Sequence, residues 1–160
     1  MALTSLTEYL DTHNVPYVVI SHSPSYTAQR VAGLAHIPGK ELAKTVIVKL
    51  DGKLAMVVIP AKFHVDLALL RNATNAKSVA LASEDEFKDR FPQCETGAMP
   101  PFGNLFSLDV LADDSLEKDK EIAFNAGTHR ELIRMTWEDF KRLAKPKVIR
   151  FAAGRSAEAA

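Results

Sequence analysis

The sequence predicts an α+β fold, a single domain in which helices surround a mixed, mainly antiparallel central sheet of six to seven strands. Its 160 residues suit one domain with a core of its own. Segments with apolar residues at helical spacing are interspersed with β-branched runs. The dipeptide Asp51-Gly52 separates two such runs and is the strongest short-range signal for a β-hairpin. We place the domain at residues 1–152 and expect residues 153–160 to form a flexible tail.

The N-terminal part of the chain predicts a helix, a strand and a second helix. Apolar residues repeat at helical spacing over residues 3–13. The run VPYVVIS, near 15–21, is β-branched and aromatic and favours a strand. Thr27 suits the N-cap of the second helix, which we expect to end near His36.

The middle of the chain predicts the hairpin and two helices. TVIVKL and LAMVVIP flank its turn and are almost continuously apolar, so we expect both strands to lie in mid-sheet with both faces covered. DLALLRNAT predicts a helix and SVALA a short strand. Ser83 and Glu86 form a capping-box signature at the start of a helix in SEDEFKDRF.

The C-terminal third predicts strands near 104–111, 121–126 and 131–135. Thr136 is the expected cap of a helix in TWEDFKRLAK, and KVIRFA is the expected final strand.

Charge is balanced overall but uneven along the chain. Twenty basic and twenty acidic residues argue against a protein that coats long nucleic acid, so we expect no DNA partner. Residues 141–155 carry six basic residues and no acidic one, whereas residues 109–121 are acidic. Solvated surface is the ordinary interpretation of both runs, and a phosphate contact is the alternative for the basic one.

Cysteine content and hydropathy indicate the compartment. Cys94 is the only cysteine, so no disulfide framework is expected and the reducing cytoplasm is the simplest location. The segment MALTSLTEYLDTH does not resemble a signal peptide. No apolar run approaches the roughly 20 residues that cross a bilayer, so we expect no membrane partner.

The loop GAMPPFG begins at Gly97 and is stiff. Pro100 and Pro101 fix two φ angles and lack backbone N–H groups. N–H donors remain on residues such as Gly97, Ala98 and Met99, and a rigid arc of donors suits a carbonyl oxygen or a developing oxyanion. A rigid connection from a helix to a strand explains the same composition.

Two other segments hold candidate polar groups. Lys44, in AKT, lies at the start of the first hairpin strand, where its ammonium either reaches solvent or faces a cleft and binds a phosphate or a polarised carbonyl. His129 follows the turn residues Asn125 and Gly127 in FNAGTHREL. It belongs either to an ordinary hairpin loop or to a pocket in which its imidazole hydrogen-bonds or carries a proton.

No metal or organic cofactor is expected. The five histidines lack zinc-ligand spacing, and the chain contains neither G-x-G-x-x-G nor G-x-x-x-x-G-K-[ST]. Cys94 is a further candidate nucleophile, although no second feature indicates a Cys–His dyad.

Taken in order, these segments resemble the YbaK/prolyl-tRNA-synthetase-associated editing domains. The resemblance rests on AKT, the Gly-x-x-x-Pro element from Gly97 to Pro101 with the FG after it, FNAGTH before ELIRM, and HSPSYTAQRVAGL at 22–34. It covers roughly residues 3–151 and is strongest with the small free-standing members. The second proline departs from the family pattern, which has a small or polar residue there in several relatives.

The resemblance implies a mixed α/β domain that hydrolyses the ester between a wrong amino acid and the 3′ end of a tRNA. The implied target is tRNA-Pro carrying Ala, Cys, Ser, Thr or 2-aminobutyrate, without a cofactor. The implied partner is the acceptor end of aminoacyl-tRNA, and a synthetase partner stays open. The implied catalytic residues are Lys44, Gly97 and His129, and the implied substrate contacts are Ala98, Met99, Pro100, Pro101, Phe102, Gly103, Asn125, Gly127 and Thr128.

Two other functions remain open from the sequence. One is a non-catalytic tRNA- or synthetase-binding module of the same fold. The other is a small-molecule ester or amide hydrolase that uses Cys94.

Overall fold

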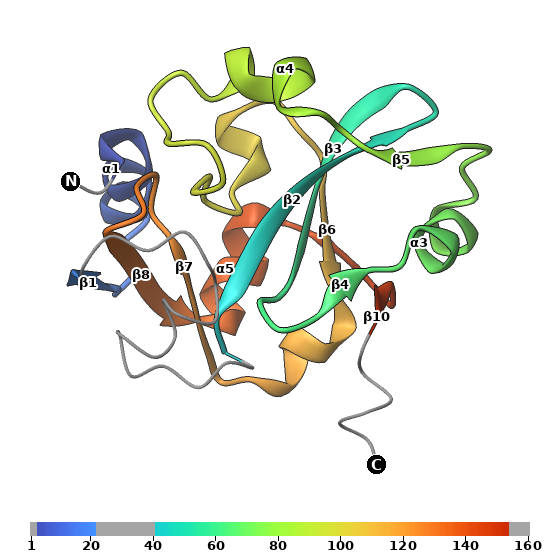
Figure 1. Cartoon of the computed structure of the whole chain (residues 1–160). Coiled ribbons are helices and arrows are strands. Elements are labelled where there is room, and N and C mark those ends of the chain that lie inside the picture. Colours follow the sequence, from blue (N-terminus) through green and yellow to red (C-terminus); the bar gives the residue numbers. More distant parts are fainter. Residues whose placement is uncertain (1–2, 22–40, 154–160) are drawn as a thin grey trace.

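The computed structural model describes residues 3–21 and 41–153 (Figure 1). These residues form a mixed α+β fold with sheets of five, three and two strands. The helix expected between Thr27 and His36 lies outside the described residues, as does almost all of the expected tail.

Helix α1 (Thr4–Thr12) packs one face into the core through Leu6 and Leu10. Its start is fixed by Leu3, whose backbone N–H donates to the carbonyl of Ala126 over 2.8 Å. Since Ala126 lies in the turn after β7, this bond ties the N-terminal helix to a turn that contributes to the candidate site.

The largest sheet has the strand order β5-β2-β3-β6-β9. β2 and β3 form the predicted hairpin, and both turn residues have positive φ, as a two-residue hairpin turn requires. The β3–β6 and β6–β9 pairs are parallel. The strands are β2 (Ala43–Leu50), β3 (Lys53–Pro60), β5 (Val79–Leu81), β6 (Val110–Asp113) and β9 (Lys147–Ile149).

Two smaller sheets contain the remaining strands. β7 (Glu121–Asn125) and β8 (Glu131–Thr136) form an antiparallel hairpin, and β1 (Val18–Ser21) pairs with the other edge of β8. β4 (His64–Val65) pairs with β10 (Ala152–Ala153).

The prediction of one central sheet with six to seven strands is therefore wrong. β2 and β7 approach each other at an isolated parallel bridge between Leu42 and Ala123 and then diverge (Figure 1). The Ala123 N–H also donates to the carbonyl of Glu41 over 2.9 Å. A strand pattern reports which side chains are buried and not which strands are neighbours, so neither this division nor the parallel pairing has a local signal.

The strand predicted near 104–111 begins later than expected. Gly103–Leu105 form the short 3₁₀ helix η2, and a Cβ added at Gly103 would lie 2.5 Å from the carbonyl oxygen of Leu108. The carbonyl of Gly103 accepts the N–H groups of Phe106 and Leu108, both over 2.9 Å. The chain folds back on itself here because glycine permits this close approach.

The predicted helix caps at Ser83 and Thr136 are confirmed, whereas Thr27 lies outside the described residues. The capping box of Ser83 and Glu86 starts α4 (Glu84–Phe87), and the Thr136 hydroxyl accepts the Asp139 N–H over 3.2 Å at the start of α5. The helices not yet given bounds are α3 (Leu67–Thr74), η1 (Lys88–Arg90), η3 (Asp114–Lys118) and α5 (Trp137–Ala144). None of the helices in the described part of the chain is long and apolar enough to cross a membrane.

The last predicted strand divides into β9 and β10. The carboxylate of Asp113, at the end of β6, accepts the N–H groups of Phe151 and Ala152, both over 2.9 Å. These bonds hold the segment between the two strands and direct β10 toward β4.

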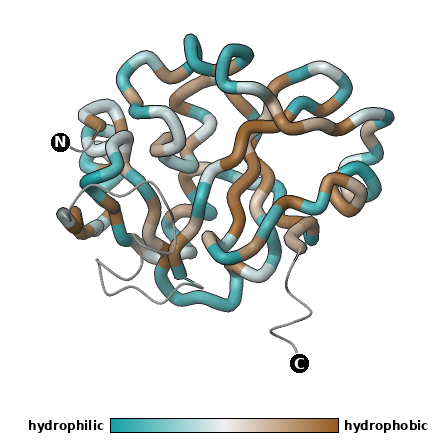
Figure 2. The backbone as a smooth tube through the Cα atoms, viewed as in Figure 1, coloured by the Kyte–Doolittle hydropathy of each residue, from teal (hydrophilic) through white to brown (hydrophobic). Residues whose placement is uncertain are grey.

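Both faces of the β2–β3 hairpin are covered, as predicted. Ile47 and Met56 face the larger core, whereas Val57 and Ile59 face a second cluster that includes Leu70 of α3. Figure 2 shows the continuous hydrophobic stretch along these strands.

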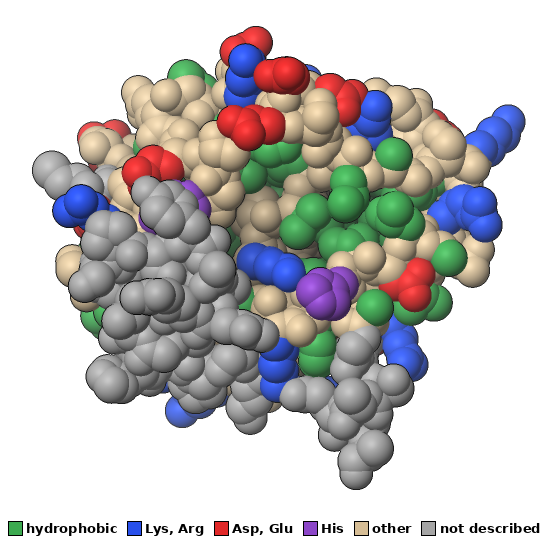
Figure 3. Space-filling view, viewed as in Figure 1, with side chains coloured by type: hydrophobic (Ala, Val, Ile, Leu, Met, Phe, Trp, Pro, Cys, Tyr) green, Lys and Arg blue, Asp and Glu red, His purple; other side chains and the backbone are tan. Residues whose placement is uncertain are grey.

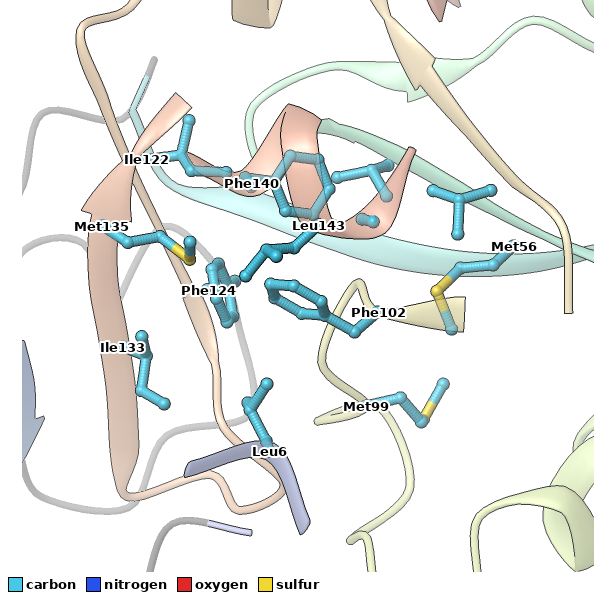
Figure 4. Packing of buried hydrophobic residues seen from close by; sticks show 14 of the residues in the cluster. Leu6, Met56, Met99, Phe102, Ile122, Phe124, Ile133, Met135, Phe140 and Leu143 are labelled. Carbon is cyan, nitrogen blue, oxygen red and sulfur yellow. The ribbon is translucent and has the colours of Figure 1, made fainter. Parts of the chain in front are cut away.

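Aromatic rings fill the centre of the larger core. The centroid of the Phe102 ring lies 5.7 Å from the ring centroid of Phe124 and 5.3 Å from that of Phe140. Met99 lies near Phe102, from the same loop (Figure 4). The core therefore fixes the GAMPPFG loop from beneath.

Candidate active site

Two of the predicted motifs meet at the tip of the β7–β8 hairpin. The Gly127 N–H donates to the carbonyl of Ala98 over 2.9 Å, and the Glu95 N–H donates to the carbonyl of Gly127 over 2.8 Å. The GAMPPFG loop and the NAGTH turn are thus joined by backbone hydrogen bonds.

His129 completes this junction. It is 7% exposed, and its backbone N–H donates to Glu95 Oε1 over 2.6 Å. Its Nε2 lies 2.7 Å from the carbonyl oxygen of Thr96. Because a carbonyl oxygen only accepts, Nε2 carries a proton in this arrangement. The imidazole is therefore held against the Gly-x-x-x-Pro loop.

Two glycines at the junction have backbone conformations that side chains rarely adopt. Gly97 has φ +84°, and a Cβ added there would lie 3.5 Å from Cε1 of His129. Gly127 has φ +98°, and a Cβ added there would lie 3.1 Å from Cβ of Leu3. The backbone conformation thus favours glycine at position 97. At position 127, both the conformation and the close packing against Leu3 favour glycine.

The loop offers fewer N–H donors than its composition indicates. The Ala98 N–H donates to the carbonyl of Glu95 over 3.0 Å and is occupied by that turn. Within the described part of the chain, no acceptor lies within hydrogen-bond distance of the N–H groups of Gly97 and Met99. Pro100 and Pro101 are buried and contribute stiffness. Gly97 and Met99 are therefore two amides of this loop that have no hydrogen-bond acceptor among the described residues.

The side chains of Met99 and Phe102 point into the core rather than away from it. Met99 is 5% exposed and Phe102 is fully buried. Both belong to the larger hydrophobic cluster together with Leu6 and Met56 (Figure 4). They support the loop from below, and Gly103 follows in the tight turn already described.

Lys44 lies in β2, outside this junction. The side chains of β2 alternate, so Lys44 shares a face with Val46 and Val48, while the loop packs on the face of Ala43 and Ile47. Its side chain is half-buried, and desolvation lowers the pKa of its ammonium from the usual 10.5.

Lys44 and Asn125 occupy corresponding positions on two strands. Each lies two residues beyond the Leu42–Ala123 bridge, on strands that run parallel at that point. Side chains two residues apart on a strand point to the same side. The side chains of Lys44 and Asn125 therefore leave their strands on the same side as those of Leu42 and Ala123. They therefore flank the place where β2 and β7 separate.

Two buried polar atoms near this place have no hydrogen-bond partner in the described residues. They are Oδ1 of Asn125 and Oγ1 of Thr45. Buried polar atoms in native proteins almost always have partners, so these two atoms are available to a hydrogen-bonding group. Thr45 is a candidate that the sequence reasoning did not include.

Glu95 and Thr96 were also missed from the sequence. Neither has a local signal, because both act through contacts with a turn more than thirty residues away. Thr128, which was predicted, lies at the tip of this turn, and its hydroxyl accepts the Arg130 N–H over 3.2 Å.

Cys94 is unsuited to nucleophilic attack in this environment. Its side chain is half-buried against the larger core, and burial raises the pKa of its thiol to about 11. The reactive form of cysteine is the thiolate, which is scarce at neutral pH under these conditions. This argues against the small-molecule hydrolase interpretation.

No metal-ligand cluster occurs in residues 3–21 and 41–153. Three hollows in the described part of the chain are lined by residues outside the junction. A hollow of about 370 Å³ borders Trp137, one of about 310 Å³ borders Tyr9 and Asn104, and a third of about 310 Å³ lies between α3 and β5.

Comparisons with solved structures define the class of fold. The chain matches the crystal structure of the hypothetical protein APE2540 with a TM-score of 0.82, at 19% identity over 92% of this chain and 98% of that one. It matches a candidate trans-editing enzyme for prolyl tRNA synthetase with a TM-score of 0.78, at 19% identity over 93% and 95%. The chain therefore shares the fold of these two proteins.

The sequence comparisons identify the family. The model of the aminoacyl-tRNA editing domain matches residues 22–143, more than half of the chain, and the chain therefore belongs to that family. This family membership makes it an enzyme of the aminoacyl-tRNA deacylase class.

Two curated relatives are similar at the same level of identity. The multifunctional Ser/Thr-tRNA deacylase ProXp-y of Escherichia coli strain K12 is 27% identical over 147 residues, 89% of this chain and 87% of the relative. A proline–tRNA ligase of Bacillus mycoides is 27% identical over 88 residues, 55% of this chain but 15% of the ligase.

Proposed function

We propose that this protein acts in trans to hydrolyse mischarged aminoacyl-tRNA, most specifically tRNA-Pro that carries a small wrong amino acid. The observation that carries the proposal is the junction of the Gly97 loop with the His129 turn. Membership of the editing-domain family and similarity to both a free-standing deacylase and a proline–tRNA ligase support the reaction class and the tRNA.

The reaction needs geometry more than a strong nucleophile, because an aminoacyl ester is already activated. Water attacks the carbonyl carbon, the bond to the ribose oxygen breaks, and a proton passes to that oxygen. The products are a free amino acid and a tRNA with a free 3′ end. The terminal ribose hydroxyl of the tRNA helps to orient the water.

Oxyanion stabilisation is assigned to the loop. The N–H groups of Gly97 and Met99 hold the developing negative charge, and the two prolines keep these donors aimed. In a well-characterised hydrolase, removal of one such donor raises the activation free energy by about 3 kcal/mol. The N–H of Ala98 already donates to Glu95. Ala98 is therefore assigned the role of joining the loop to Gly127, whose N–H its carbonyl accepts.

The proposal also assigns roles to the other predicted residues. His129 borders the aminoacyl group and positions the substrate or water. Lys44 binds the phosphate of the terminal nucleotide, and its lowered pKa reflects a partly desolvated ammonium that an anion would stabilise. Asn125 and Thr128 form the opposite wall, where the unpartnered Oδ1 of Asn125 accepts a substrate N–H or O–H.

Specificity among small amino acids is expected to overlap. A pocket distinguishes one methylene by about 1–3 kcal/mol, so Ala, Cys, Ser, Thr and 2-aminobutyrate are separated only partly by the pocket. The tRNA supplies the rest of the discrimination, with or without a synthetase that presents it. We place the activity in the cytoplasm, where aminoacyl-tRNA is consumed.

A panel of mischarged tRNAs tests the proposal. Purified protein is incubated with tRNA-Pro and a second tRNA, each charged with the five small amino acids and with proline. Release of a small amino acid from tRNA-Pro, with Pro-tRNA-Pro left intact, is expected. Tight tRNA binding with no release across the panel would instead identify a non-catalytic binding module.

A further inference from the structure

The hollow between α3 and β5 has the composition of an anion site. It has a volume of about 310 Å³, and its lining residues are Leu67, Ala68, Arg71, Lys77, Ser78 and Val79. Apolar atoms from the helix and the strand form its base. Arg71, Lys77 and Ser78 are exposed and supply two cations and a hydroxyl group.

The two cations have no ion-pair partner among the described residues. In contrast, Lys49, Arg134 and Arg142 each lie within 4 Å of a carboxylate. Arg71 and Lys77 therefore line one hollow, and neither forms an ion pair within the described part of the chain.

Two carboxylates accept backbone N–H groups of this region and keep their charge. Oδ1 of Asp51 accepts the N–H groups of Lys77 and Ser78, both over 2.9 Å. Oδ1 of Asp66 caps α3 by accepting two N–H groups of its first turn. These bonds fix the segment that carries Lys77 and Ser78, so the hollow has a defined shape.

The hollow lies on the same face of the five-stranded sheet as Lys44. Leu50 and Val79 are directly opposite each other in the β2–β5 pair, and both pack against the cluster beneath α3. Lys44 and Leu50 are six residues apart on β2 and share that face. At about 3.3 Å per residue, the hollow lies roughly 20 Å from Lys44.

Hydrophobic side chains lie between the hollow and Lys44. Figure 3 shows hydrophobic side chains gathered over β2 and β5 and basic side chains at the outer edge near α3. A distance of roughly 20 Å corresponds to about six nucleotides of a stacked strand at 3.4 Å each. A strand whose end lies at Lys44 therefore brings a phosphate to the hollow.

We infer that Arg71, Lys77 and Ser78 bind a backbone phosphate of RNA that lies several nucleotides from the 3′ end held near Lys44. The identification of this RNA as the acceptor strand of tRNA rests on the proposed function. The guanidinium of Arg71 donates two parallel hydrogen bonds to phosphate oxygens, and Lys77 adds a point charge.

The test compares two double variants with equal loss of charge. The first is Arg71→Ala with Lys77→Ala, and the control is Lys118→Ala with Lys120→Ala, which removes two exposed lysines near η3. Fluorescence anisotropy with uncharged tRNA measures Kd at several salt concentrations. Circular dichroism confirms that both variants are folded, as the exposed positions lead us to expect.

The first variant is expected to raise Kd at least tenfold and to lower the salt slope of log K by about one to two. The control is expected to stay within twofold of the wild type. Equal Kd values for the first variant and the wild type overturn the inference.

Inorganic phosphate separates the two sources of the anion. If phosphate raises Tm in the wild type but not in the first variant, while tRNA binding is the same in both, the hollow takes a free anion and the RNA proposal is overturned. Failure of the proposed function is a separate result, because absence of deacylation by the wild type leaves the binding comparison intact.

Discussion

Replacement of Glu95 by alanine is the sharpest test of how the site is built. In the wild type, Glu95 Oε1 accepts the His129 N–H over 2.6 Å, and the backbone of Glu95 bonds to Gly127 and Ala98. The variant keeps the backbone bonds and loses only the side-chain bond. Hydrogen bonds to charged groups are worth about 1.5–3 kcal/mol. Because Glu95 is exposed, water replaces part of this hydrogen bond. We expect Glu95→Ala to lose about 1.4 kcal/mol of transition-state stabilisation.

That loss corresponds to about a tenfold lower kcat/KM for deacylation. Single-turnover hydrolysis of a mischarged tRNA-Pro measures it, and hydrogen exchange of the His129 amide reports the lost bond independently of activity. Glu95→Gln is the matched control, since its amide oxygen still accepts the His129 N–H, and it should recover most of the rate. Wild-type kcat/KM in Glu95→Ala, together with faster exchange at His129, would show that the bond exists but does not position the site.

Four further predictions concern three residues. Gly97→Val should lower kcat/KM at least tenfold, because a β-branched residue at φ +84° is strained by about 1–2 kcal/mol; unchanged activity would return the loop to a purely structural role. Lys44→Ala should lower deacylation at least about tenfold, and wild-type rates would remove Lys44 from the mechanism. In the wild type, the free energy of unfolding should rise as the pH increases toward 10.5. This rise should be absent in Lys44→Met. The lowered pKa means that the unfolded chain binds more protons than the folded one in that range, so stability increases with pH. Cys94→Ala should retain full deacylation, and alkylation of the wild-type thiol should accelerate up to about pH 11; loss of activity in this variant with an intact fold would contradict the assignment.

Local patterns in the sequence were sufficient for the elements with local causes. The Asp51-Gly52 hairpin and the caps at Ser83 and Thr136 depend on residues a few positions apart, and each appears as predicted. The sheet arrangement depends on contacts between distant segments. The split at the Leu42–Ala123 bridge has no signal in either strand.

The same distinction applies to the site. The stiffness of the Gly97 loop and the turn at Gly127 were visible in composition, but their contact was not. The role of Glu95 was hidden because an exposed glutamate is ordinary on any surface. The occupation of the Ala98 N–H likewise depends on a turn that composition does not specify.

We propose that the junction of the Gly97 loop and the His129 turn deacylates mischarged tRNA-Pro. The most direct test of this proposal is single-turnover release of the amino acid from alanine-charged tRNA-Pro by the wild type and by Gly97→Val, at saturating protein. The account predicts release by the wild type well above the spontaneous rate, and at least a tenfold lower rate in the variant. Release by both proteins at equal rates, or at the spontaneous rate by the wild type on every mischarged tRNA-Pro, would contradict it.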